Sequence, residues 1–101
     1  MQVEQFERSL LASELPAGLS EALQVLWFDG RGDWDAAHGI AQDMLCEDGA
    51  WLHAFLHRRE GDLANADYWY RRAGRRRPEI GLDEEWRSLV EWFASRQQAS
   101  D

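Results

Sequence analysis

Two histidines and a glutamate stand at spacings that could support chemistry. His53 and His57 are four residues apart and Glu60 follows three residues later, so on a helix all three share one face. Imidazoles can bind a metal, transfer a proton or donate to an anion. The glutamate that marks a helical zinc protease is missing beside the first histidine. A metal site of His53, His57 and Glu60 remains one alternative, and catalysis by a histidine with Cys46 or Glu60 another.

The segment after these histidines offers polar and aromatic partners at three- and four-residue spacing. These partners are Asn65, Tyr68, Trp69 and Arg72. An orphaned buried polar group costs about 1–3 kcal/mol, so we expect a hydrogen-bonded network of both histidines, Glu60, Asn65 and a Tyr or Arg. Besides the metal and catalytic alternatives, this network can simply fix how two helices pack, or it can form a pocket for an anion or small ligand.

Apolar periodicity predicts an all-α chain of about six helices, because no segment alternates with period two. We expect one domain with a capping helix over 1–15, a first helix hairpin over 19–47, a second hairpin over 49–77 and a C-terminal helix over 82–98. The expected helix N-caps are Ser20, Asp33, Asp48, Asp62 and Asp83.

The two hairpins are predicted to share one design. Gly32-Asp33 aligns with Gly61-Asp62, and Ala37 with Ala66, at an offset of 29 residues. In both, glycine would end one helix in a left-handed turn and aspartate would cap the next. We therefore expect two stacked hairpins whose exposed ends are covered by the first and last helices.

Residues 50–78 resemble one tetratricopeptide repeat. The resemblance rests on Ala54, the Gly61-Asp62 turn, Ala66, Tyr70 and Pro78, whereas the first hairpin is shorter than such a repeat. It implies a short helical-repeat, protein-binding scaffold. The stretch from Trp51 to Gly74 is also similar to one in small uncharacterised bacterial and fungal proteins.

The resemblance also implies a groove for ligands. Trp51, Phe55, Arg58 and Arg59 map to concave positions where such domains hold peptides, so they would suit an acidic segment or a C-terminal carboxylate. Alternatively, Trp51 and Phe55 pack against the neighbouring hairpin. Two sites that normally hold leucine and tyrosine hold His53 and His57 here, which sets this hairpin apart from the repeat pattern.

The composition and charge of the chain indicate its class of ligand and its cellular compartment. The chain has a formal charge of −8, six tryptophans and no lysine, and its charges are uneven: residues 51–77 hold seven arginines and three acids. The acidic whole argues against nucleic acid, and we expect the arginines between 71 and 77 to pair with Asp83, Glu84 and Glu85, within the chain or across a homodimer. We predict a cytoplasmic protein without a membrane span, because the chain has one cysteine, no signal-peptide pattern and no apolar run of about 20 residues.

The sequence thus favours a small cytoplasmic binding protein over an enzyme, and it predicts no cofactor. The expected partner is a protein segment or a compact anionic ligand at the second hairpin. The expected binding residues are Trp51, His53, Phe55, His57, Arg58, Arg59, Asn65, Tyr68 and Arg72.

Overall fold

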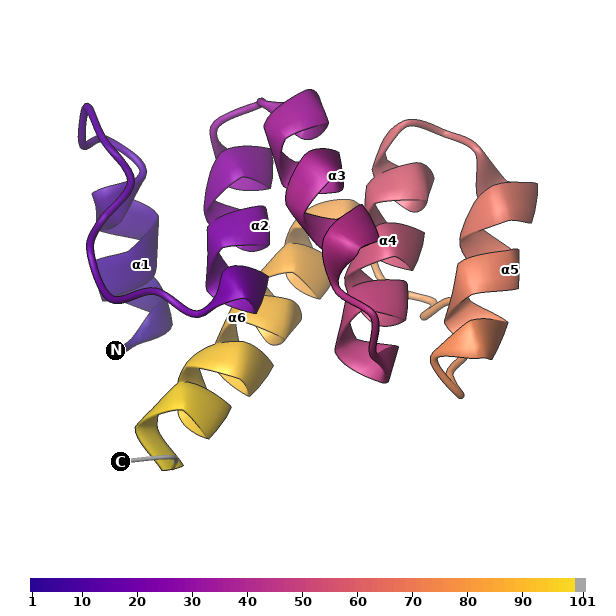
Figure 1. The fold of residues 1–101 in the computed structure, drawn as a ribbon. Coiled ribbons are helices and arrows are strands. Elements are labelled where there is room, and N and C mark those ends of the chain that lie inside the picture. Colours follow the sequence, from indigo (N-terminus) through magenta and orange to yellow (C-terminus); the bar gives the residue numbers. More distant parts are fainter. Residues whose placement is uncertain (100–101) are drawn as a thin grey trace.

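Six helices make up the protein in a computed structural model that describes residues 1–99, with side chains through residue 97 (Figure 1). No strand occurs within residues 1–99, so the expected all-α class is confirmed. No helix in this range is long and apolar enough to cross a bilayer. The helices are α1 (Val3–Ser9), α2 (Glu21–Gly30), α3 (Trp34–Asp43), α4 (Glu47–Arg59), α5 (Leu63–Arg72) and α6 (Leu82–Ala99).

The turns that build the two hairpins form as the sequence indicates. Ser20, Asp33 and Asp62 each accept a hydrogen bond from the backbone N–H three residues on, which satisfies an otherwise unpaired amide of the helix start. Gly32 and Gly61 have φ angles of 80° and 90°, the left-handed region that disfavours a Cβ. The repeated Gly-Asp pairs therefore set both hairpin turns.

Other helix ends differ from expectation. α4 begins at Glu47 with Cys46 as its N-cap, so Asp48 is not the cap. Gly49 explains the earlier start: a Cβ there would lie 2.2 Å from the Met44 carbonyl oxygen, so only glycine lets the α3–α4 connection pack against the first turn of α4. α1 ends at Ser9 rather than near residue 15, because the chain tightens there into successive i→i−3 hydrogen bonds.

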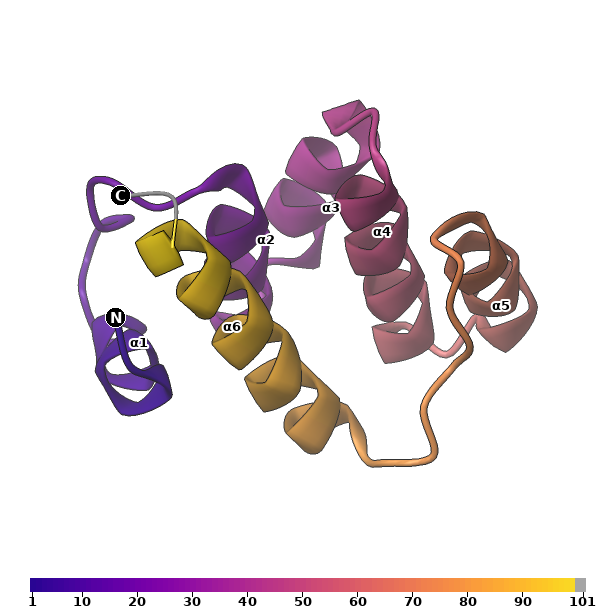
Figure 2. The same cartoon turned by 90° about the horizontal axis from the view of Figure 1, so that it is seen from below.

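Helices α1 to α5 follow one another across the molecule, and α6 runs diagonally behind this row in the view of Figure 1 and along one side of it in Figure 2. The helix contacts join α2 to α3, α3 to α4 and α4 to α5, while α6 packs on α2 and α1. α6 therefore covers the stack along one side, mainly over α1 and α2. Its stripe of Trp86, Leu89, Val90 and Phe93 is buried in the main core, and this requires α6 to lie across several helices.

Two apolar clusters hold the helices together. The larger one draws side chains from α1, α2, α3, α4 and α6. A separate small one joins α4 to α5 through Ala54, Ala66 and Tyr70, all nearly inaccessible to solvent. Alanines at this contact let the two helices approach closely, which brings the polar side chains beside them into register.

Candidate functional site

Three imidazoles meet between α3 and α4. The Nε2 atoms of His38 and His53 are 3.0 Å apart. One ring nitrogen from each of His38, His53 and His57 lies within 4.8 Å of the other two. His53 and His57 are buried and His38 is half-buried. The cluster contains all three histidines of the chain and draws them from two helices.

Tryptophans orient the cluster from both sides. The Trp34 ring stacks on His38 at a centroid distance of 4.6 Å, and the Trp69 ring stacks on His53 at 4.1 Å. Trp34 is itself fixed, because its indole N–H donates to the Leu56 carbonyl oxygen at 2.7 Å. The imidazoles therefore lie between two aromatic walls that limit their rotation.

The hydrogen bonds of His57 assign its tautomer. Its Nδ1 is 2.6 Å from a Glu60 carboxylate oxygen, so Nδ1 carries the proton and donates. The side-chain amide of Asn65 lies 3.4 Å from Nε2 and donates to it. This network places a lone pair on Nε2, the form in which histidine binds a metal.

The surroundings also keep two of the imidazoles neutral. Burial, followed by the neighbouring His38 and His57, lowers the pKa of His53 to about 4. Burial, followed by His57, lowers the pKa of His38, although Glu60 and Asp35 act in the opposite direction. Both rings therefore favour the uncharged state at neutral pH, and one Nε2–H donates to the other Nε2 across their 3.0 Å contact.

A cavity of about 350 Å³ opens beside His53. Trp69 and Arg72 line it from α5, where the Arg72 guanidinium lies 5.1 Å from the centre of the Trp69 ring and donates to the Tyr68 hydroxyl. The exposed Cys46 lines the same cavity. The histidine cluster thus has a space beside it that is large enough for water or a small ligand.

The network predicted from the sequence forms in part. His57, Glu60 and Asn65 come together as expected, and His53 stands against them. The expected Tyr or Arg is replaced by His38, which was not among the residues predicted for this network. The signal was available, because His38 follows Trp34 by four residues and precedes Ala41 by three, so that these side chains share one helix face.

The groove expected from Trp51, Phe55, Arg58 and Arg59 requires correction. Phe55 is wholly buried and cannot line an open surface. Arg58 is ion-paired at 2.6 Å with the buried Glu85. Arg59 forms a two-point ion pair with the buried Asp29, at 3.2 and 2.9 Å. The two arginines hold helices together, because a buried carboxylate needs a cation and hydrogen bonds to offset its desolvation.

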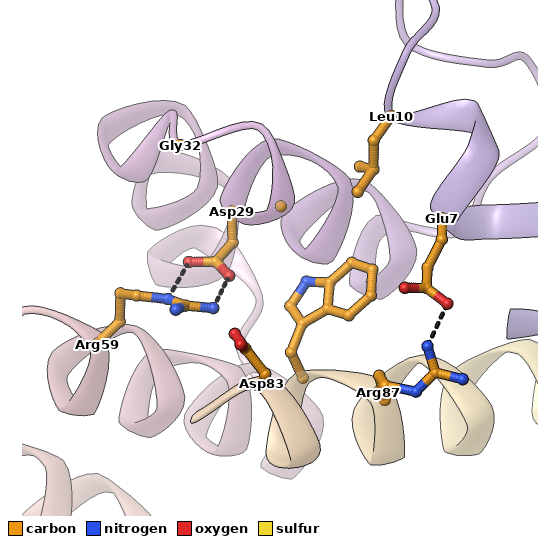
Figure 3. Close-up of a pocket in the computed structure, with 9 residues that line it drawn as sticks. Glu7, Leu10, Asp29, Gly32, Arg59, Asp83 and Arg87 are labelled. Carbon is orange, nitrogen blue, oxygen red and sulfur yellow. Dashed lines mark hydrogen bonds and ion pairs between the residues drawn. The ribbon is translucent and has the colours of Figure 1, made fainter. Parts of the chain in front are cut away.

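The Arg59–Asp29 pair lies at one end of a second cavity of about 440 Å³ (Figure 3). Arg87 and Glu7 form another ion pair at the opposite end, and the exposed Asp83 lies between the two pairs. Burial raises the pKa of Asp29 even though Arg59 opposes the shift. Because most of its charges are already paired, this cavity offers fewer free ligand atoms than the histidine cluster.

No protein-family model matches the chain, and no curated protein or solved structure is significantly similar to it.

Proposed function

We propose that this protein binds a divalent transition-metal ion through His38, His53 and His57. The observation that carries the proposal is the convergence of three imidazole nitrogens within 4.8 Å. Two nitrogens bound to one tetrahedral zinc at about 2.0–2.1 Å lie about 3.3–3.4 Å apart. The Nε2 atoms of His38 and His53, at 3.0 Å, need to separate by only a few tenths of an ångström.

The third ligand is His57 through Nε2. The hydrogen bond from its Nδ1–H to Glu60 supports this role, because carboxylates commonly orient metal-binding histidines and raise their basicity. Glu60 therefore supports the ligand rather than binding the ion itself. Asn65 would release Nε2 when the ion enters, since the same lone pair serves both.

The ligand set indicates the class of metal. Three imidazole ligands suit zinc, copper and nickel, whereas magnesium and calcium prefer oxygen ligands. Three protein ligands leave a fourth coordination position, which is the pattern of zinc sites that bind water or a substrate. The cavity beside His53 provides room for that fourth ligand.

Zinc titration of metal-free protein by calorimetry tests the proposal. We expect one ion per chain. Replacing a ligand, in His38→Ala or His53→Ala, should abolish this binding, and Glu60→Gln should weaken it by about 10- to 100-fold. Cys46→Ser is the matched control, because its exposed thiol is the other soft ligand nearby and its loss should leave zinc affinity unchanged. Circular dichroism establishes that each variant is folded. Equal zinc binding by wild type and His38→Ala would refute the assignment.

A further inference from the structure

The end of α5 and the loop beyond it carry an unusual concentration of positive charge. Five of the seven residues from 71 to 77 are arginines, all of them exposed, in a chain whose net charge is −8. Cations at a helix C-terminus interact favourably with the helix dipole, but this effect falls off beyond the last turn. α5 ends at Arg72, so the dipole does not account for Arg75, Arg76 and Arg77.

Four of these arginines surround one cavity of about 380 Å³. They are Arg71, Arg75, Arg76 and Arg77, and the other lining residues are Asp67 and Tyr70. Asp67 is paired with Arg77 at 3.1 Å. The Tyr70 hydroxyl donates to Glu85 and is not available to the cavity. One carboxylate thus faces four guanidiniums, which repel one another unless an anion joins them.

Within the chain, these arginines do not form the ion pairs that were expected with the acids at the start of α6. Glu85 is occupied by Arg58 and Tyr70. Arg71 and Arg76 form no ion pair or hydrogen bond with the side chains described through residue 97. Their donors are therefore free to bind a ligand.

Arg75 is held in place by aromatic rings rather than by an acid. Its guanidinium lies 3.5 Å from the centre of the Trp51 ring and 5.2 Å from that of Trp92. Stacking of this kind engages the face of the guanidinium and leaves its N–H edge for an oxygen acceptor. The rings thus fix one cation at the cavity without neutralising it.

We propose that this cavity, the arginine site, binds the diphosphate group of a small molecule. Planar guanidiniums match phosphate oxygens through paired hydrogen bonds. The uncompensated positive charge of the arginine site exceeds the charge of about −1.5 to −2 on one phosphate monoester, so two linked phosphoryl groups fit it better. An extended polyanion such as RNA fits poorly, because the chain as a whole carries a net charge of −8.

Titration calorimetry with pyrophosphate, a nucleoside diphosphate, orthophosphate and a single-stranded RNA tests this inference. Chelator present throughout removes any contribution from the histidine cluster. The test variant is Arg71→Ala/Arg76→Ala, because these two side chains form no ion pair or hydrogen bond with the side chains through residue 97. The control is Arg8→Ala/Arg96→Ala, which removes two exposed arginines outside the cavity and changes the net charge equally.

We expect pyrophosphate and the nucleoside diphosphate to bind one per chain and more tightly than orthophosphate. The test variant should weaken this binding at least about tenfold, while the control stays near wild type. If pyrophosphate and the nucleoside diphosphate bind with equal affinity, the arginine site contacts the phosphates alone. If the nucleoside diphosphate binds more tightly, the site also contacts its nucleoside part. The inference is overturned by undetectable diphosphate binding, by equal loss in both variants, or by tighter binding of RNA.

Discussion

Replacing Arg58 with alanine should destabilise the fold strongly, because it would leave a buried carboxylate without its cation. Glu85 is 2% exposed and receives two short hydrogen bonds, from Arg58 and from the Tyr70 hydroxyl, both at 2.6 Å. Arg58 also donates to the Ile80 carbonyl oxygen. This network joins α4 and α5 to the first turn of α6.

The magnitude follows from the burial of the pair. Removing one partner of a buried ion pair costs about 3–5 kcal/mol, because the remaining charge is desolvated without compensation. The side chains of Arg58 and Glu85 are 15% and 3% exposed, so we expect a loss within this range. A domain of this size unfolds with about 5–15 kcal/mol, so the variant should be only marginally stable. Arg87 pairs with Glu7 at 45% and 40% exposure, and Arg87→Ala should cost at most about 1 kcal/mol.

Equilibrium unfolding in urea, followed by tryptophan fluorescence, measures both variants against wild type. The double variant Arg58→Ala/Glu85→Gln supplies the control, because a neutral amide at position 85 removes the orphaned charge. It should be more stable than Arg58→Ala alone. The reasoning is refuted if Arg58→Ala stays within about 1 kcal/mol of wild type, or if Glu85→Gln brings no recovery.

Two further outcomes follow from burial and backbone geometry. The pKa of His53 is about 4 in the folded protein and 6.5 in the unfolded chain, so its contribution to stability is complete above pH 6.5 and is lost as the pH falls toward 4. The free energy of unfolding of the metal-free protein should therefore fall by up to about 3 kcal/mol over this window. Urea titrations at each pH should show that His53→Gln removes most of this pH dependence. Gly49→Ala should destabilise the fold by more than about 1 kcal/mol, because the new Cβ would collide with the Met44 carbonyl oxygen. Gly39→Ala lies inside α3 with no atom near its Cβ, so it should stabilise the fold by about 0.5–1 kcal/mol. Thermal melts of both variants check this contrast, and a shift of the melting temperature in the same direction in both would contradict it.

Local signals in the sequence were sufficient to predict the helices and the turns of the two hairpins. The Gly-Asp pairs at 32–33 and 61–62 specify left-handed turns followed by N-caps, and both depend only on neighbouring residues. The start of α4 was misjudged because it depends on a contact between Gly49 and Met44 that no local preference encodes.

The candidate site was predicted less completely, because it depends on how helices pack. His53, His57 and Glu60 share one helix face and were found by spacing, whereas His38 joins them only when α3 packs against α4. In the same way, the position of Arg58 in the repeat pattern implied a ligand groove, whereas the packing of α6 pairs this arginine with a buried carboxylate. Spacing predicts which residues share a helix face, whereas the packing of the helices against one another decides which charges are already paired.

The most direct test of the three-histidine metal site is the visible absorption of the metal-free protein titrated with Co²⁺. Cobalt in a four-coordinate site absorbs far more strongly than hexaaqua cobalt, so the spectrum reports coordination as well as binding. We predict intense d–d bands that saturate at one ion per chain, remain in Cys46→Ser and disappear in His38→Ala. Weak bands characteristic of six-coordinate cobalt, or intense bands that survive in His38→Ala, would contradict the proposal that His38, His53 and His57 bind a metal together.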